Sequence, residues 1–144
     1  MSFDFTSRGL MDIRHLRFQR VWLCIGILLL LLVLVGSVIP IPAPVRSIML
    51  HDKVAHTLAY AGLMGWFAQI FRHDLTRLIL VVGLVMMGVG IEFLQGMTGS
   101  RQFDVLDMVA NTSGVVLAWG LAYTWVGNTL VWVEGVFCRT ILRA

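Results

Sequence analysis

The stretch VWLCIGILLLLLVLVGSVI, residues 21–39, contains no charged residue and decides the fold. A helix rises about 1.5 Å per residue, so roughly 20 apolar residues cross the hydrocarbon core of a bilayer. A secretory signal is the alternative, because Arg14, Arg17 and Arg20 precede the stretch. However, the apolar core exceeds the roughly 7–15 residues of a signal peptide, and the proline-rich residues 40–44 replace a small-residue cleavage site. The pattern favours an uncleaved membrane anchor.

Three further apolar segments, residues 54–71, 78–97 and 108–133, also have the length of a membrane-spanning helix. The whole chain of 144 residues is 58% hydrophobic and only 13% charged, whereas about a quarter of a soluble domain is charged. We therefore predict an all-α fold, a bundle of four transmembrane helices that forms a single unit. Its parts are a cytoplasmic segment 1–20, a membrane domain 21–133 and a cytoplasmic tail 134–144.

The lysines and arginines predict the orientation of the bundle. One side of the predicted membrane domain holds Arg8, Arg14, Arg17, Arg20, Arg72, Arg77, Arg139 and Arg143, and the other holds Arg46, Lys53 and Arg101. Short loops rich in basic residues stay in the cytoplasm, so both termini are predicted to be cytoplasmic in a multi-pass protein of the bacterial plasma membrane. The net charge of +3 then reflects topology and contact with anionic membrane lipid rather than nucleic-acid binding.

Small residues recur at intervals of four along the last predicted helix. They are Ala110, Gly114, Ala118 and Ala122. Lipid provides no hydrophobic driving force between helices, so close packing at small residues is what holds membrane helices together. The row predicts a close approach of a second helix along this face.

Polar residues that a plain membrane bundle does not need gather at one end of the predicted helices. They are Asp52, Lys53, His56, Glu92, Gln95, Arg101, Asp104, Asp107 and Asn111. Spacings of three and four place the residues of each segment on one face of its helix. If these faces turn toward the bundle axis, they form a polar site that opens to the non-cytoplasmic side. This set is the predicted ligand-binding site.

Several of these residues also have a purely structural interpretation. Asp52 and Asp104 suit the N-caps of the second and fourth helices, and Asp107 suits the first turn of the fourth. For the whole set, the structural alternative is an ion-pair network that only ties the helices together.

Glu92 is harder to explain as a cap, because it lies near the C-terminal end of the third predicted helix. The helix dipole disfavours a negative charge there, and about five residues of helix place Glu92 roughly 7 Å below the interface. We therefore expect a cationic partner. Arg101 is the first choice, because a guanidinium can bind a carboxylate through two parallel hydrogen bonds, and Lys53 is the second.

Catalysis and metal binding are the remaining chemical alternatives. Glu92 and His56 are candidate general bases. Together with Asp52 and Asp107 they offer nitrogen and oxygen ligands, but the chain has no HExxH motif and no close histidine pair on one face. We therefore predict no metal site and no cofactor, and binding, catalysis and a structural role stay open.

In chain order, the polar residues form the motifs Asp52-Lys53-x-x-His56, Glu92-x-x-Gln95 and Arg101-x-x-Asp104-x-x-Asp107-x-x-x-Asn111-x-x-Gly114. This series resembles the VanZ-like family of small bacterial membrane proteins over roughly residues 52–120. The resemblance implies a compact helical membrane domain, found in some members beside genes for glycopeptide resistance, and the family's name comes from a protein linked to teicoplanin resistance. It implies no agreed reaction.

From the residues and the resemblance together, we expect a cell-envelope protein whose polar site engages a polar or lipid-linked molecule, such as a cell-wall precursor or a glycopeptide. Glycopeptide tolerance is one physiological outcome of such binding. A membrane enzyme that acts on an envelope precursor and a structural or assembly partner are the two alternatives.

Overall fold

The computed structural model describes residues 16–39, 52–98 and 103–141, and over these residues the regular elements are helices. They are α1 (Gln19–Val38), α3 (Asp52–Ile70), α4 (Asp74–Thr98), α5 (Val105–Leu121), the short 3-10 helix η1 (Trp125–Asn128) and α6 (Thr129–Ile141). The predicted all-α fold is confirmed.

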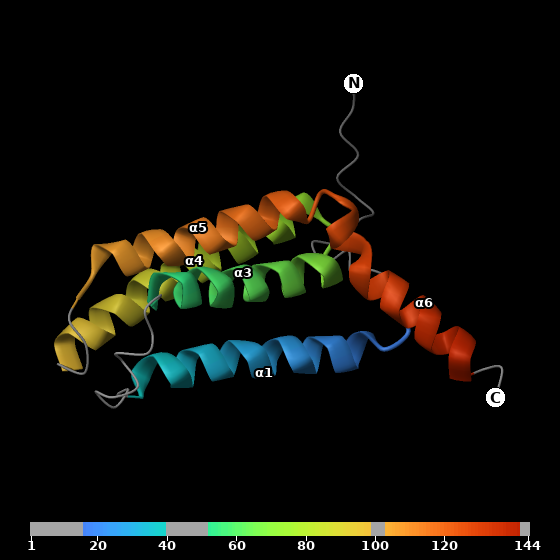
Figure 1. The fold of residues 1–144 in the computed structure, drawn as a ribbon, viewed down its shortest axis with the longest axis horizontal. Coiled ribbons are helices and arrows are strands. Elements are labelled where there is room, and N and C mark those ends of the chain that lie inside the picture. Colours follow the sequence, from blue (N-terminus) through green and yellow to red (C-terminus); the bar gives the residue numbers. More distant parts are fainter. Residues whose placement is uncertain (1–15, 40–51, 99–102, 142–144) are drawn as a thin grey trace, which may run out of the picture.

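Helix α3 is the centre of the molecule. Helices α1, α3, α4 and α5 lie along one long direction, with α3 packed against the other three (Figure 1). Its buried residues Tyr60, Leu63, Met64 and Ala68 form one core cluster with residues of α4 and α5. The prolines that follow the first apolar stretch lie outside the described residues, and α1 ends just before them.

The row of small residues on α5 produces the predicted close approach. A Cβ atom on Gly114 would collide with the carbonyl oxygen of Thr57 in α3 and would lie 3.0 Å from the backbone nitrogen of Ala61. At the same contact, the Thr57 hydroxyl donates a hydrogen bond of 3.2 Å to the carbonyl of Ala110. Backbones at this distance leave no room for a side chain at position 114, so the prediction from the small-residue row is confirmed.

The prediction of four spanning helices is confirmed only in part. By length and apolar composition, α1 and the segment Asp74–Met97 of α4 can cross a membrane, and α5 joined to α6 makes a third, bent candidate. Helix α3 coincides with the predicted segment 54–71. Its composition is too polar for it to be counted among the helices that can cross a membrane. A helix at the centre of a bundle meets protein on most of its faces, so it needs less apolar surface than a helix that meets lipid.

The predicted fourth span, residues 108–133, is wrong as a single helix. Helix α5 ends at Leu121, and the axis of the following helical segment is turned by 77°. The Thr124 hydroxyl accepts a hydrogen bond from the backbone nitrogen of Val126 and so starts η1. Gly127 packs so closely on Ala122 that a Cβ atom there would collide with the Ala122 carbonyl. The apolar residues on both sides of the turn concealed it from the hydropathy pattern.

The two ends of the bundle differ in charge. We call the end where α1 begins and α3 and α5 finish the basic end, on the right in Figure 1. It holds Arg17, Arg20, Arg72, Arg77 and Arg139. The opposite end, which we call the acidic end, holds Lys53, Glu92, Asp104 and Asp107. The candidate site residues that the structure describes therefore lie at the end opposite to most of the arginines.

Candidate functional site

The first turn of α5 supplies two carboxylates to the acidic end. Asp104 has an extended backbone and caps the helix, since its Oδ1 accepts a hydrogen bond of 2.8 Å from the backbone nitrogen of Leu106. Its Oδ2 lies 2.6 Å from Nζ of Lys53. The capping interpretation of Asp104 is confirmed, and the same side chain also forms an ion pair with α3.

Lys53 is held by both carboxylates of this turn. Its ammonium group donates to Asp104 and, at 2.9 Å, to Oδ1 of Asp107. The hydrogen bond from Lys53, followed by that from the Leu106 amide, lowers the pKa of Asp104. Lys53 is thus neutralised by two anions, and a ligand phosphate would have to displace a carboxylate to reach it.

His56 lies one turn further into α3, between two residues of α5. Its Nδ1 is 3.1 Å from Oδ1 of Asn111, and its Nε2 is 3.6 Å from Oδ2 of Asp107. A general base needs a ring nitrogen whose lone pair can reach the substrate proton. Both ring nitrogens of His56 face oxygen atoms of the protein, so this arrangement suits the joining of α3 to α5 better than proton abstraction.

Glu92 reaches α5 from α4. The side chain is 1% exposed, and its Oε1 accepts a hydrogen bond of 2.5 Å from the backbone nitrogen of Asp104. Glu92 therefore does take part in capping, but at the start of α5 rather than on the helix that carries it. Lys53, the second choice of cation, bonds to the α5 carboxylates instead. Arg101 lies outside the described residues, so its pairing with Glu92 stays a prediction.

Tyr60 lies one turn beyond His56, about halfway along α3, and was not among the predicted site residues. It is 1% exposed, and within the described part of the chain its buried hydroxyl has no hydrogen-bond partner. Its ring and the Asn111 side chain both pack on Gly88 of α4, where an added Cβ would lie 3.3 Å and 3.1 Å from them. The signal in the sequence was its position, four residues after His56 on the same helix face.

Two other predicted site residues lie elsewhere or cannot be placed. The Nε2 of Gln95 donates to the carbonyl of Ser37, so Gln95 ties α4 to α1. Asp52 begins α3, and its side chain is outside the described set. Within the ranges that the structure describes, no three His, Cys, Asp or Glu side chains are grouped so that they could hold a metal ion.

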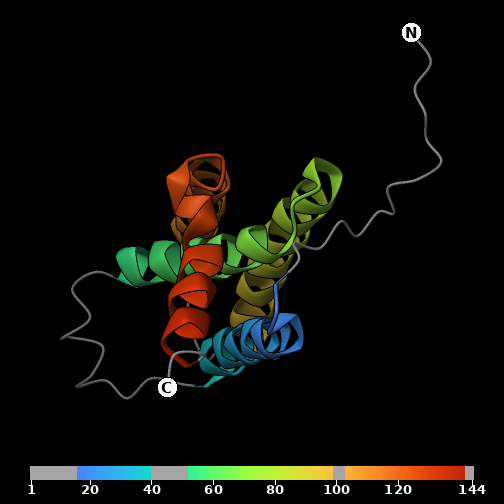
Figure 2. The same ribbon diagram turned by 90° about the vertical axis from the view of Figure 1, so that its right-hand side faces the viewer.

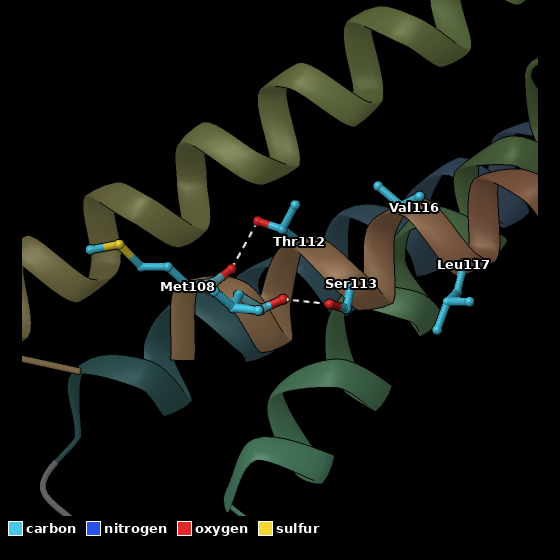
Figure 3. A pocket seen from close by; sticks show the side chains of 6 residues that line it. Met108, Thr112, Ser113, Val116 and Leu117 are labelled. Carbon is cyan, nitrogen blue, oxygen red and sulfur yellow. Dashed lines mark hydrogen bonds between the residues drawn. The ribbon is translucent and has the colours of Figure 1, made fainter. Parts of the chain in front are cut away.

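An apolar groove lies on the outer face of α5, close to the polar cluster. Its volume is about 560 Å³, and it begins at Met108, the residue that follows Asp107 (Figure 3). Two hydroxyl residues line it, but each bonds its own helix: Thr112 donates to the Met108 carbonyl and Ser113 to the Val109 carbonyl. With these hydroxyls satisfied, the groove presents mainly apolar atoms.

The fold and the polar cluster define a small all-helical protein with helices apolar enough to cross a membrane. Residues 9–127 match the family model described as VanZ/LLP1, and the chain belongs to this family. An uncharacterized protein of Schizosaccharomyces pombe is 35% identical over 79 residues, which cover 53% of this chain and 49% of that protein. The chain thus spans about half the length of this curated relative, and no solved structure matches it.

Proposed function

We propose that this chain is a multi-pass protein of the bacterial plasma membrane whose acidic end engages the head group of a lipid-linked envelope molecule. In this proposal α1, α3, α4 and α5 cross the bilayer, and α3 is shielded by the other three. The basic end faces the cytoplasm with both termini, which agrees with the preference of arginines for that side. The acidic end then faces the opposite side of the membrane.

The observation that carries the proposal is the buried hydroxyl of Tyr60, which has no hydrogen-bond partner among the residues that the structure describes. A buried polar group without a partner costs about 1–3 kcal/mol, and native proteins leave few such groups unsatisfied. Its neighbours in the cluster are satisfied by each other, as Lys53 is by Asp104 and Asp107. A hydroxyl, amide or ammonium group of a ligand would supply the missing partner and would suit the surrounding carboxylates.

The groove on α5 supports the lipid-linked part of the proposal. It begins one residue after Asp107 and continues to Leu117 along the helix. A ligand with a polar head at the acidic end and an acyl or prenyl chain would have an apolar surface beside it. Tolerance of teicoplanin-type glycopeptides would follow if the bound molecule were a cell-wall precursor.

The test is mass spectrometry of the full chain purified in native membrane patches. The variant Tyr60→Phe removes one oxygen atom, and its matched control Tyr123→Phe removes the hydroxyl that donates to Asp74 at the basic end. We expect a lipid-linked species in the wild type and the control that is depleted in Tyr60→Phe. The same species at equal abundance in all three proteins would refute the site.

A structural lock is the second candidate function, and the closed contacts of His56 with Asp107 and Asn111 favour it. In that case Tyr60→Phe removes an unsatisfied oxygen and raises the thermal midpoint while the bound lipids stay the same. Substitution of His56 by Gln would lower the midpoint without changing lipid content. The two candidates therefore predict different lipid contents for Tyr60→Phe: depletion if the site binds a ligand, and no change if it is a structural lock.

A further inference from the structure

Helix α6 crosses the basic end of the bundle and lies beyond residue 127, where the family match ends. Figure 2 looks at this end and shows α6, in red, running across it from α5 toward α1. The backbone nitrogen of Leu130 donates to Oε1 of Gln69 near the end of α3, at 2.8 Å. One turn later, Glu134 accepts from the backbone nitrogen of Phe18 at the start of α1, at 2.9 Å. The first half of α6 therefore lies at the level where the bundle helices start and stop.

Only a narrow face of α6 is covered by the rest of the molecule. Leu130 and Glu134, one turn apart, are 5% and 8% exposed. On the uncovered side, Trp132 is 66% exposed, Val136 42% and Phe137 58%. Thirteen residues of helix are about 20 Å long, which is too short to cross a hydrocarbon core of about 30 Å.

All the tryptophans of the chain belong to the same end. They are Trp22 in the first turn of α1, Trp66 in the last turns of α3, Trp119 near the end of α5, Trp125 in η1 and Trp132 in α6. Trp125 is 82% exposed. Tryptophan is enriched where membrane meets water, because its ring is apolar and its N–H is polar. This level of the molecule is therefore marked as an interface with lipid head groups.

The charge of the same end selects the kind of lipid. Arg17, Arg20, Arg72 and Arg139 are all exposed there. Clusters of basic residues beside a membrane are attracted to anionic phospholipids. An exposed aromatic and aliphatic face beside exposed arginines has the composition of a helix that lies on an anionic membrane surface.

We propose that η1 and α6 lie in the plane of the bilayer at the basic end, with Trp125, Trp132 and Phe137 seated among anionic lipid head groups. Glu134 fixes this helix to the start of α1. The 77° turn after α5 is then the place where the chain leaves its membrane-crossing direction and enters the membrane surface.

Nitroxide labelling of the full chain tests the proposal. In a Cys24→Ser, Cys138→Ser background, single cysteines replace residues 132, 133, 136, 137 and 140, and Met86 in α4 as the reference for the hydrocarbon core. The proteins are reconstituted in vesicles of phosphatidylcholine with one quarter phosphatidylglycerol. Depth is read by electron paramagnetic resonance from the relative access of oxygen and a water-soluble nickel complex. We expect depths along α6 that oscillate with the helical period and show no overall trend.

Each other outcome overturns the proposal. A steady change of about 1.5 Å per residue would make α6 the second half of a broken span. Exclusion of both probes from residues 132 and 136 would indicate a second protein copy on this face, and full access to nickel would place it in water. A deep label at residue 86 in any of these cases would leave the membrane-crossing bundle intact.

The lipid charge is tested in the same system. In vesicles of phosphatidylcholine alone, we expect the nickel accessibility of labels at 132 and 136 to rise at least twofold, while the label at 86 is unchanged. Equal accessibility in both lipid mixtures would remove the requirement for anionic lipid. The triple variant Arg17→Gln, Arg20→Gln, Arg72→Gln should reproduce the neutral-lipid result in the anionic vesicles.

Discussion

Loss of the Glu134 carboxylate should detach α6 from α1. Its Oε2 accepts a hydrogen bond of 2.8 Å from the backbone nitrogen of Arg17, and its Oε1 accepts from the backbone nitrogen of Phe18 and, at 2.7 Å, from Nε1 of Trp22. Helix α1 has no side-chain cap from its own N-cap residue. Glu134 therefore satisfies donors at the start of α1 that the local sequence leaves open.

The expected loss of stability follows from these three hydrogen bonds. A hydrogen bond to a charged group contributes about 1.5–3 kcal/mol, but the donors at the start of α1 are partly buried and regain some bonding to water. We expect Glu134→Ala to destabilise the protein by about 3–5 kcal/mol. Glu134→Gln keeps one acceptor oxygen for Phe18 and Trp22 and loses the bond to Arg17, so it should cost about 1–2 kcal/mol.

Two measurements follow the detachment. The thermal midpoint in lipid nanodiscs should fall in the order wild type, Glu134→Gln, Glu134→Ala, with Val136→Ala as a control on the uncovered face of α6. In a Cys24→Ser background, alkylation of Cys138 should become faster, because its side chain is half-buried and lies against the Arg17 guanidinium, 3.8 Å from the sulfur atom, while α6 is attached, and detachment uncovers the thiol.

A double-mutant cycle decides whether the bonds themselves are responsible. Trp22→Phe removes the indole donor and keeps an aromatic ring. If Glu134 and Trp22 interact as the structure describes, the double variant should lose less than the sum of the single variants. Additive losses, or a Glu134→Ala protein with unchanged midpoint and unchanged Cys138 reactivity, would refute the attachment.

Three further outcomes concern the helix contact, the ion pair and the orientation. Gly114→Ala should destabilise the contact of α3 with α5 by about 1–3 kcal/mol. Gly120→Ala should be neutral or slightly stabilising, because the added Cβ would meet no other element within 4 Å in the described part of the chain. Equal effects of the two substitutions would contradict the close approach. The lowered pKa of Asp104 means that its contribution to stability is present at neutral pH and is lost as the pH falls through that pKa. The difference in midpoint between wild type and Asp104→Asn should therefore be present at pH 7 and disappear well below about pH 4, and a difference that is constant with pH would exclude the ion pair. Reporter fusions after Ala144 and within residues 40–50 should report opposite sides of the membrane, with the first in the cytoplasm.

Much of the bundle was predictable from the sequence, because its signals are local. The uninterrupted apolar run fixed α1 to within two residues, and the apolar run of α4 was recognised although its first turn was not. Spacing also brought together the right faces, since His56 does meet Asp107 and Asn111. These predictions succeeded because helical periodicity alone decides which side chains share a face.

The turn between α5 and α6 was missed because hydropathy does not change across it. Its signals are weak and local: the Thr124 cap and Gly127, which permits the contact with Ala122. The contact that holds α6 in its new direction is also invisible to local patterns, because Glu134 and Phe18 are 116 residues apart. A carboxylate in an apolar segment was the available clue, since it required a partner somewhere.

The contact of Glu92 with Asp104 was also not predictable from local patterns, and it explains how the polar cluster is built. In a capping box, the N-cap side chain bonds the start of the helix, and the third residue of the helix bonds back to the N-cap amide. At α5 the N-cap is Asp104 and the third residue is Asp107, but the bond to the Asp104 amide comes from Glu92 on another helix. Asp107 is thereby released to hold Lys53 and to approach His56. Substitution of Glu92 would disturb the position of every one of these groups. A ligand lost in Glu92→Ala would therefore not show whether Glu92 contacts the ligand or only holds the other residues in place. Removal of the single Tyr60 oxygen leaves these bonds intact, which makes it the sharper probe of the site.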